Sequence, residues 1–429
     1  MSFSQALSGL NAQSENLKIL GNNIANSQTV GFKSSGAIFA DVFAGANSQV
    51  GLGVKVANVR QDFTAGDLES TGRTLDLAVA GEGFYRVEQS SGEAAYTRNG
   101  QFSQDNEGFL VNSSGQRLTG YGLSDINDPF SEVIAGGAPQ ALRIPADDIP
   151  AQETGRTTAT YNLDASVVAT ENKQTAVLYD QFGTTDPANE VEVEYHFSNS
   201  FTVYDSLGNA RNVSTYYTKT GDNTWNVQVA RDGVKLDDSN NDFTLTFDAN
   251  GNLERDANNN IIGVGGGEEV NFTFPADDLG GAEELDFTFN LVGTTQFNNT
   301  SIQNTLTQDG YSSGSLAGLE ITRDGRVIRI FTNEQRRDAG QVVLANFANE
   351  EGLQPIGDNA WRETNASGVG IIGTAGTGVF GTIESGVLEN SNVDLAKQLV
   401  DTIVSQRAYQ ANSTSISTQD ELLQTIINL

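Results

Sequence analysis

The chain has 429 residues, with 24 Lys and Arg against 55 Asp and Glu, which gives a formal net charge of −31. This length exceeds one ordinary hydrophobic core, so we expect several domains. The negative charge disfavours binding to nucleic acid and to anionic lipid, because both are recognised mainly through Lys and Arg. The chain has no cysteine, which excludes disulfides, zinc–thiolate sites and thiol catalysis.

Residue patterns for catalysis are missing from the sequence. The single histidine, His196, stands in a predicted strand and is interpreted as a structural residue, not as part of a catalytic triad. We find no P-loop and no nucleophile elbow, so we predict no enzyme, no cofactor and no metal site. The chain begins without a basic region followed by an apolar core, and no apolar run approaches the roughly 20 residues of a membrane span. We therefore expect no cleaved signal peptide and no membrane insertion.

Residues 1–26 predict an amphipathic helix. Phe3, Leu10, Leu17 and Ile24 recur every seven residues, and Ala6 and Leu20 lie three residues after two of them, which is the a/d seam of a coiled coil. Only Gln13 interrupts the seam. The segment has one Glu and one Lys, so such a helix is marginal alone in water and should need partners.

A second helix is predicted over residues 393–429. Asn392 or Asp394 can cap it, and it continues to Leu429 without Gly or Pro. We expect the two terminal helices to form a coiled-coil-like inner domain whose apolar seam is the assembly surface. In the C-terminal helix this seam consists of Leu395, Leu399, Ile403, Tyr409, Ile416, Leu423 and Ile427.

The chain between the helices is typical of strands and turns. Residues 146–297 form a compositionally distinct segment, with 26 acidic and 7 basic residues and recurrent alternating strands. Asp324-Gly325 between apolar runs indicates a hairpin in the segment that follows. The predicted fold class is mostly β with terminal α-helices, with two β-rich outer domains of which the outermost is inserted into the other. The predicted division is 1–27 with 388–429 as helical polymerisation domain, 28–70 with 371–387 as extended connector, 71–145 with 298–370 as inner β domain, and 146–297 as inserted acidic domain.

Two patterns resemble ligand sites but favour simpler interpretations. Gly376 to Gly381 matches G-x-G-x-x-G, yet a further glycine follows and no helical period, so a glycine-rich connector is favoured over a dinucleotide site. Asp248–Asn252 and Asp256–Asn260 lack the glycine that a calcium loop needs at its sixth position, so both are interpreted as turns. Cation binding by the acidic domain stays open.

Blocks at both ends and beside them resemble the bacterial flagellar rod and hook proteins. In the N-terminal block the motif residues are Asn22, Asn23, Ile24, Asn26, Gly31, Phe32 and Lys33. The remaining blocks are Ser8–Ala12, Thr71–Val79, Gly83–Tyr85, Tyr96–Gly100, Leu118–Tyr121, Ser391–Asp394 and Gln406–Asn412. Within this family, the length and the 146–297 insertion are similar to the hook branch and not to the shorter distal rod proteins.

The resemblance implies a structural subunit of the flagellar hook. Such a subunit assembles with itself into a bendable helical tube that transmits motor torque to the filament. The implied partners are the flagellar rod, the hook cap, the hook–filament junction proteins and the flagellar type III export apparatus, which exports proteins without a cleaved leader. The implied location is the hook of the flagellum at the extracellular surface. A distal rod subunit, or a secreted β-rich adhesin or binding protein, is the alternative.

Overall fold

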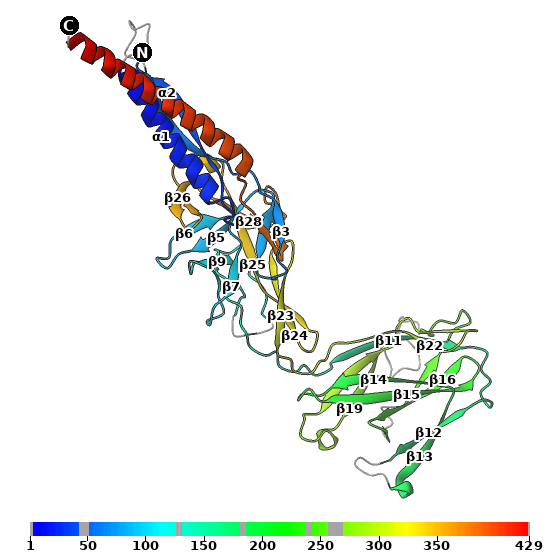
Figure 1. Ribbon diagram of the computed structural model, residues 1–429. Coiled ribbons are helices and arrows are strands. Elements are labelled where there is room, and N and C mark those ends of the chain that lie inside the picture. Colours follow the sequence, from blue (N-terminus) through cyan, green and yellow to red (C-terminus); the bar gives the residue numbers. More distant parts are fainter. Residues whose placement is uncertain are drawn as a thin grey trace. The chain divides into compact units, whose positions relative to one another are not determined.

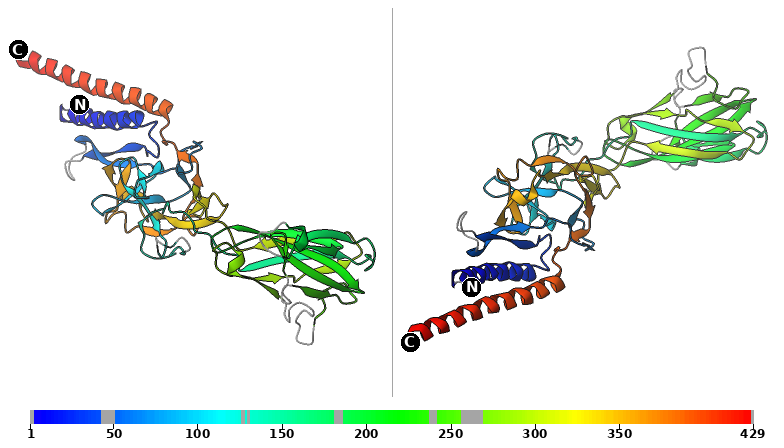
Figure 2. Two further views of the ribbon diagram at one scale, coloured as in Figure 1. Left: turned by 90° about the horizontal axis from the view of Figure 1, so that it is seen from below. Right: turned by 90° about the horizontal axis from the view of Figure 1, so that it is seen from above.

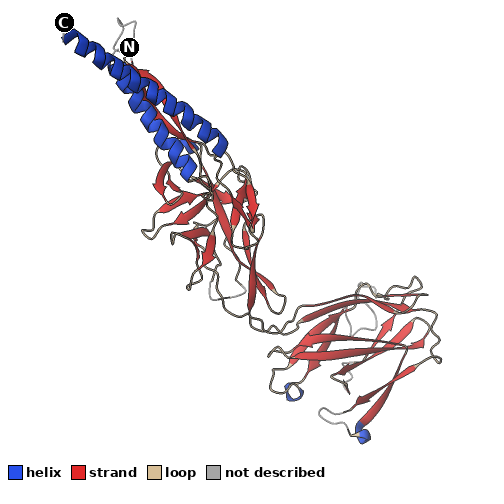
Figure 3. Cartoon of the chain, viewed as in Figure 1, coloured by secondary structure: helices blue, strands red, loops and turns tan. Residues whose placement is uncertain are grey.

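The computed structural model describes residues 3–42, 51–125, 128, 131–180, 186–236, 242–255 and 269–427. The chain divides into two compact units (Figure 1). The first unit comprises Met1–Asp147, Ala317–Ile330 and Arg336–Leu429, and the second comprises Asp148–Leu316 and Phe331–Gln335. Strands dominate both units, and a long helix lies at each end of the chain (Figure 3), which confirms the predicted fold class.

The two terminal helices, α1 (Phe3–Ala25) and α2 (Leu395–Ile427), lie side by side and antiparallel (Figures 1 and 2). Helix α2 begins after Asp394, whose carboxylate accepts a hydrogen bond of 3.0 Å from the backbone N–H of Lys397. This bond is a standard N-cap, because it satisfies one of the free N–H groups of the first turn. Of the two predicted caps, Asp394 is therefore the one used.

A β-hairpin occupies much of the segment predicted as an extended connector. Strands β1 (Ser35–Val42) and β2 (Gly53–Gln61) pair with each other and contact α1. The Gln5 side-chain amide donates to the carbonyl oxygen of Gly51 at 2.6 Å, and the backbone N–H of Val54 donates to the Ser8 hydroxyl at 3.2 Å. Because an isolated two-stranded ribbon is marginal in water, this packing against α1 explains why the segment is ordered.

The body of the first unit contains a large, mostly antiparallel sheet that joins strands from before and after the second unit. Two separate two-stranded sheets also belong to it, β3 (Leu68–Ser70) with β30 (Val387–Glu389) and β4 (Leu77–Ala80) with β29 (Thr382–Ser385). Strand β25 (Arg336–Asn346) pairs with β9 (Arg117–Tyr121) and β5 (Phe84–Glu88), and β27 (Ala360–Arg362) pairs with β6 (Ala94–Thr97). Its core contains buried residues from both parts, including Val79, Leu118 and Val342. The strands of this body are β3 (Leu68–Ser70), β4 (Leu77–Ala80), β5 (Phe84–Glu88), β6 (Ala94–Thr97), β7 (Phe102–Gln104), β8 (Leu110–Asn112), β9 (Arg117–Tyr121), β10 (Gln140–Ala141), β23 (Leu316–Ile321), β24 (Arg326–Phe331), β25 (Arg336–Asn346), β26 (Gln354–Gly357), β27 (Ala360–Arg362), β28 (Ile371–Thr374), β29 (Thr382–Ser385) and β30 (Val387–Glu389). A short 3₁₀ helix, η3 (Glu350–Gly352), precedes β26.

The second unit contains two sheets that share one aromatic-rich core. The rings of Phe201 and Phe289, one from each sheet, stack with centroids 5.3 Å apart. Trp225 is fully buried and donates its indole N–H to the side-chain oxygen of Gln296 at 2.6 Å. The first sheet comprises β11 (Arg156–Asp164), β19 (Glu269–Phe274), β20 (Leu285–Asn290), β21 (Thr295–Phe297) and β22 (Ile302–Gln308). The second comprises β12 (Gln174–Tyr179), β13 (Glu190–Tyr195), β14 (Phe197–Tyr204), β15 (Ala210–Gly221), β16 (Thr224–Arg231), β17 (Val234–Lys235) and β18 (Phe243–Thr246); the 3₁₀ helices are η1 (Pro187–Asn189) and η2 (Ala276–Asp278).

This unit extends beyond the predicted border at residue 297. Strand β22 pairs along β11, with Thr158 opposite Thr307 and Thr160 opposite Thr305. The second unit extends to β22 because β22 completes the sheet that contains β11.

His196 lies at the junction of β13 and β14, where its Nδ1 accepts from the backbone N–H of Lys219 and its Nε2 lies 3.2 Å from the carbonyl oxygen of Glu171. This pairing agrees with the predicted structural role of the histidine.

Tyr96 belongs to an aromatic cluster of the first unit, and it gives a test of this packing. Its hydroxyl donates to a Glu363 carboxylate oxygen at 3.1 Å, and burial together with Glu363 raises the pKa of Tyr96 to about 12. Above the ordinary pKa of 10, the unfolded chain loses this proton before the folded chain does. Relative to a Tyr96→Phe variant, the parent should therefore lose stability as the pH rises from 10 to 12. Denaturant unfolding of the two proteins at pH 9 to 12 measures the change in stability. The tyrosinate absorbance that the folded parent shows and the folded Tyr96→Phe variant lacks should appear near pH 12, and its appearance near pH 10 would contradict the burial argument.

Candidate assembly surface

Polar side chains bond across the contact between α1 and α2, and α1 also contacts β1 and β2. On α1 the buried residues are Ala6, Gly9, Ala12, Leu20 and Asn23. The Asn16 side-chain amide donates to the Ser405 hydroxyl at 2.7 Å, and that of Asn23 donates to the Gln398 side-chain oxygen at 3.2 Å. A side chain at Gly9 would meet the Asn412 amide at 2.9 Å. Gly9 therefore stands close to α2, and a side chain there would require the Asn412 amide to move.

Helix α2 turns its apolar side chains away from this contact. Leu399 and Ile403 are 48% and 51% exposed, while Ser405, two residues further on, is buried against α1. At 3.6 residues per turn, Leu399 lies about 100–120° and Ile403 about 140–160° around the helix axis from Gln398 and Ser405. The exposed apolar residues of this helix are Leu395, Leu399, Val400, Ile403, Val404, Leu422 and Leu423.

The structure divides the predicted seam between covered and uncovered positions. In α1, Leu20 is buried, Leu10, Leu17 and Ile24 are half-buried, and Phe3 is 53% exposed. In α2, Tyr409 and Ile416 are half-buried, whereas Leu395, Leu399, Ile403 and Leu423 are exposed. Ile427 is the last helical residue, and its side chain lies outside the described residues.

A shallow groove with apolar walls lies at the end of the helix pair where both termini meet. Phe3 of α1 lines it together with Leu422 and Leu423 of α2. The rest of its lining is polar and consists of Thr414, Ser415, Thr418 and Gln419. Apolar surface that is left open to water in a single chain favours association with another molecule.

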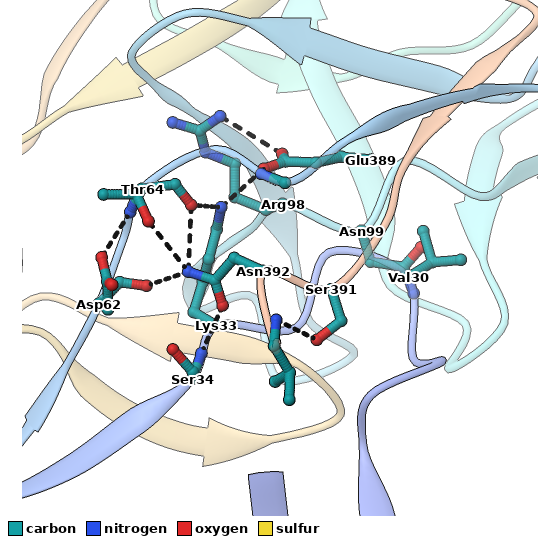
Figure 4. Close-up of polar contacts among 12 residues, drawn as sticks. Val30, Lys33, Ser34, Asp62, Thr64, Arg98, Asn99, Glu389, Ser391 and Asn392 are labelled. Carbon is teal, nitrogen blue, oxygen red and sulfur yellow. Dashed lines mark hydrogen bonds and ion pairs between the residues drawn. The ribbon is translucent and has the colours of Figure 1, made fainter. Parts of the chain in front are cut away.

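Below the helices, three distant segments meet in a buried ion cluster (Figure 4). The Lys33 ammonium lies 2.6 Å from one carboxylate oxygen of Glu389, and the Arg98 guanidinium lies 3.4 Å from the other. The three side chains are 1%, 0% and 3% exposed. Lys33 also donates to the carbonyl oxygen of Thr64 at 2.7 Å, and the backbone N–H of Gly66 donates to Glu389 at 2.9 Å. These bonds compensate much of the desolvation of the charges.

Burial has a measurable consequence for Lys33. Desolvation lowers the pKa of Lys33 below its ordinary value of 10.5, and the attraction of Glu389 offsets part of this effect. The direction of the shift indicates that desolvation exceeds the local attraction. Glu389 is therefore essential to the cluster, because without it two cations would remain in a site that disfavours charge.

Gly31 in the motif Val30-Gly31-Phe32-Lys33 is required by the same junction. It has a φ of +67°, and its backbone N–H donates to the carbonyl oxygen of Glu389 at 2.7 Å. A Cβ at this position would stand 2.6 Å from the carbonyl carbon of Arg98. Only glycine satisfies both the left-handed backbone and this close approach.

Asparagine amides join the neighbouring backbone segments. Asn23 bonds both backbone groups of Ser35, donating to its carbonyl at 2.7 Å and accepting from its N–H at 2.9 Å. Asn392 accepts from the N–H of Ser34 at 2.8 Å and donates to the carbonyl of Asp62 at 2.8 Å (Figure 4). The predicted motif residues Asn23 and Lys33 thus join α1 and β1 to the segment that leads into α2.

The rest of the predicted motif lies around the end of α1. Asn26 donates its amide to the backbone oxygen of Asn22 at 3.0 Å and to the Asn22 side-chain oxygen at 2.5 Å. Thr29 then donates to the Asn26 side chain at 3.1 Å, and Phe32 is half-buried beside this turn. These bonds satisfy the free carbonyl end of the helix and direct the chain into the junction.

Sequence reasoning missed Arg98 and Glu389 as members of the cluster. Arg98 lies within a motif that was recognised, but its partner stands 291 positions away. A single sequence does not show which charged residues are buried or which distant residues they contact. Only the fold brings Lys33, Arg98 and Glu389 together.

Of the patterns that resemble a dinucleotide site and calcium loops, the described residues form a connection between strands and a turn. Residues 376–381 connect β28 to β29, so a strand follows the glycines where a dinucleotide site requires a helix. Asp248 accepts from the backbone N–H groups of Asn250 and Asn252, which makes the first acidic loop a turn. Asp256–Asn260 lies outside the described residues. Among the described residues, no three His, Asp or Glu side chains gather in a potential metal site, and no helix is long and apolar enough to cross a membrane.

Four protein-family models together match most of the chain. "Flagella basal body rod protein" matches residues 4–33, and "Flagellar hook protein FlgE/F/G D1 domain" matches residues 78–159. "Flagellar basal body protein FlaE D2 domain" matches residues 162–311, and "Flagellar basal body rod FlgEFG protein C-terminal" matches residues 384–429. The two terminal matches include α1 and α2, respectively.

Relatives align with the chain from end to end. The flagellar hook protein FlgE of Escherichia coli is 44% identical over 433 residues, and that of Salmonella typhimurium is 42% identical over 432 residues; both alignments cover 100% of each chain. The FlgE of Treponema pallidum is 31% identical over 474 residues, with 100% of this chain and 99% of the relative covered. The crystal structure of Helicobacter pylori hook protein FlgE2 has a TM-score of 0.51 at 14% identity, covering 74% of this chain and 99% of that one, which indicates a shared fold. The chain therefore belongs to the flagellar hook protein family.

Proposed function

We propose that this chain is the structural subunit of a flagellar hook and that it assembles with itself into a bendable tube through its terminal helices. The observation that carries the proposal is the exposed apolar side of α2, with Leu399 and Ile403 facing away from α1. Burying such a surface releases roughly 25 cal/mol per Å² of apolar area, which favours packing against helices of neighbouring copies.

The distribution of charge supports this role. Helix α1 carries one Glu and one Lys, and the five charged residues of α2 sum to −1, although the whole chain carries −31. Copies of a strongly acidic chain repel one another, so contacts between copies are favoured where charge is nearly absent. The near-neutral helices satisfy this condition for the inside of a tube.

In this proposal the remaining segments transmit torque and permit bending. The buried cluster of Lys33, Arg98 and Glu389 fixes the helix pair to the first β unit, so force on the helices reaches the body. Polar, hydrated contacts between the β units of neighbouring copies are exchanged more readily than apolar ones during bending. Of the predicted domain division, 1–27 with 388–429 as helical part and 28–70 with 371–387 as connector stay part of the proposal, with β1–β2 as an ordered piece of the connector. The predicted border between 71–145 with 298–370 and 146–297 shifts, so that β22 (Ile302–Gln308) belongs to the acidic unit.

The proposed location is the hook of the flagellum at the extracellular surface, and membership of the hook protein family supports it. We propose export by the flagellar type III apparatus without a cleaved leader, addition beneath a hook cap, and contacts with the rod and with the hook–filament junction proteins. The role is structural and not catalytic. A distal rod subunit is the nearest alternative, and the end-to-end match to hook proteins favours the hook.

Truncation tests the proposal directly. Deleting residues 1–26 or 393–429 should abolish tube formation, because either deletion removes one member of the helix pair. Both deletions retain Lys33, Arg98 and Glu389, so the β units should keep their circular dichroism spectrum and a cooperative unfolding transition. Electron microscopy of each variant at the concentration where the full chain forms tubes measures the outcome. Tubes formed by a chain that lacks both segments would refute the role of the helices.

A further inference from the structure

The histidine of the chain, His196, stands at one end of a two-stranded ribbon in the second unit. The ribbon consists of β12 and β13, and Gln174 lies opposite Tyr195 at this end (Figure 1). His196 follows β13 directly, and Glu171 lies three residues before β12. We call the end of the ribbon that is marked by Glu171 and His196 its foot.

The two nitrogens of the His196 ring have different partners, which fixes the position of its proton. The backbone N–H of Lys219 on β15 donates to Nδ1 at 3.0 Å, and Nε2 lies 3.2 Å from the carbonyl oxygen of Glu171. A backbone N–H group can only donate and a carbonyl oxygen can only accept, so Nδ1 carries no proton and Nε2 carries one. The neutral ring therefore joins the chain in front of β12 to strand β15.

The ribbon packs on the rest of the unit through a small contact. At the end away from the foot, the backbone N–H of Tyr179 donates to the carbonyl oxygen of Gly233 at 3.0 Å. Near the foot, the Thr218 hydroxyl donates to the carbonyl oxygen of Glu194 at 2.6 Å. The apolar cluster between these two bonds consists of Leu178, Val193, Ala230 and Tyr216.

This contact is separate from the main core of the second unit. No side chain of β12 or β13 belongs to the large aromatic-rich core that the two sheets share. Segments with few buried apolar contacts open at a lower free energy than the strands of a core. The bonds at the foot are therefore a substantial part of what closes the ribbon.

The charged groups around the His196 ring come from both strands that it joins. Glu194 on β13 attracts a positive ring, but its carboxylate is paired with the Lys173 ammonium at 2.8 Å. The Lys219 ammonium lies 5.9 Å from the centre of the buried Trp225 ring, whose centroid lies 6.1 Å from that of His196. A second proton on His196 would thus gain little from Glu194 and would be repelled by Lys219.

We propose that His196 is a pH-sensitive clamp, which closes the foot of the β12–β13 ribbon when its ring is neutral and releases it when the ring is protonated. The second proton turns Nδ1 into a donor that faces the N–H donor of Lys219, so the hydrogen bond between them is lost. The ring then no longer joins the two sides of the foot. This inference concerns the single chain and does not depend on the proposed assembly.

The titration of a free imidazole limits the size of the effect. Its ordinary pKa is about 6.5, so roughly one-tenth of free rings are protonated at pH 7.5 and roughly nine-tenths at pH 5.5. An open ribbon takes up this proton without losing a bond, whereas a closed ribbon loses the bond to Lys219. Lowering the pH from 7.5 to 5.5 should therefore raise the open population several-fold, and at most about tenfold.

The state of the ring is tested by nuclear magnetic resonance of the full chain. Because the sequence contains one histidine, a sample labelled with nitrogen-15 in histidine gives the signals of His196 alone. At pH 8 the two nitrogen shifts should show an unprotonated Nδ1 and a protonated Nε2. A neutral ring with its proton on Nδ1 would contradict the clamp.

Hydrogen exchange followed by mass spectrometry tests the opening. Protection of β12 and β13 at pH 7.5 and 5.5 is expressed relative to the exchange of the unfolded chain at the same pH. In the parent it should fall several-fold at pH 5.5, while protection of β16 changes less. His196→Asn retains a side-chain oxygen that accepts from Lys219 at either pH, so its ribbon should stay protected. His196→Phe retains a ring beside Trp225 but no acceptor, so its ribbon should exchange faster than that of the parent at pH 7.5 and should not respond to pH.

Three results would overturn the clamp. The first is equal ribbon protection at both pH values in the folded parent, and the second is an equal loss of protection in β16, which would indicate unfolding of the whole unit. The third is a His196→Asn variant that is folded, as judged by its unfolding temperature, and keeps the pH response of the parent. If a variant does not fold, the ring state and the pH response of the parent decide the question. These measurements do not involve tubes, so their failure leaves the proposed function intact.

Discussion

Replacing Glu389 with alanine is expected to destabilise the first unit by about 3–5 kcal/mol, the usual cost of leaving a buried charge without its partner. The carboxylate is the shared partner of Lys33 and Arg98, at 2.6 and 3.4 Å, and all three side chains are almost fully buried. Its loss also removes the acceptor for the backbone N–H of Gly66. Urea unfolding of the monomer, followed by circular dichroism, measures the change in free energy.

A double variant distinguishes the charge effect from loss of packing. Lys33→Met with Glu389→Gln removes one cation together with the anion and keeps side chains of similar size. It should recover part of the stability lost in Glu389→Ala, because fewer unpaired charges remain buried. If Glu389→Ala unfolds at the same denaturant concentration as Arg117→Ala, whose exposed ion pair with Glu107 should contribute little, the ion cluster does not hold the junction.

Replacing Leu399 and Ile403 together with lysine is expected to abolish tube formation at concentrations at least tenfold above that needed by the parent. Both side chains are about half exposed in the single chain, and lysine has good helix propensity, so the monomer should unfold at nearly its normal temperature. In the proposed tube the same positions are buried, and burying two unpaired ammonium groups per subunit costs far more than the contact yields.

Val177→Lys provides the matched control for this variant. Val177 is 54% exposed on β12 of the second unit, so the substitution replaces an equally exposed apolar residue away from the helices. Its tubes should form as those of the parent do. Sedimentation and electron microscopy measure both variants, and normal tubes from the Leu399 and Ile403 double variant would contradict the proposed packing of α2.

Local patterns in the sequence predicted the secondary structure well. The period of seven in residues 1–26 and the uninterrupted stretch after Asp394 predicted α1 and α2, because helix formation and capping depend on residues a few positions apart. Asp324-Gly325 predicted the turn between β23 and β24, and Gly325 has the positive φ of +82° that such a turn requires. The β1–β2 hairpin was not predicted, since its order depends on contacts with α1 that no local pattern reveals.

The amphipathic patterns did not reveal which side of each helix faces its partner in the chain. Of the seam positions in α1, Ala6 and Leu20 are buried within the chain, whereas Phe3 is exposed and Leu10 and Leu17 are half-buried; the buried residues Gly9 and Ala12 lie off the seam. A hydrophobic pattern shows which residues gain by burial, and it does not distinguish a partner in the same chain from one in another copy. Gly9 of α1 stands against Asn412 of α2, while the large apolar residues Leu399 and Ile403 of α2 are exposed in the single chain.

By itself, the sequence determined the two terminal helices, the β-rich body, the acidic insertion and the membership of a flagellar family, because each rests on local period, composition or short motifs. Only the tertiary structure decided that Lys33, Arg98 and Glu389 form one buried cluster and that β22 completes a sheet of the second unit. Lys33 and Glu389 are separated by 356 positions, and the place of β22 depends on strand order and register. Such contacts are fixed by the packing of the whole chain, since the free energy of burying a charge or aligning a strand depends on neighbours that the local sequence does not contain.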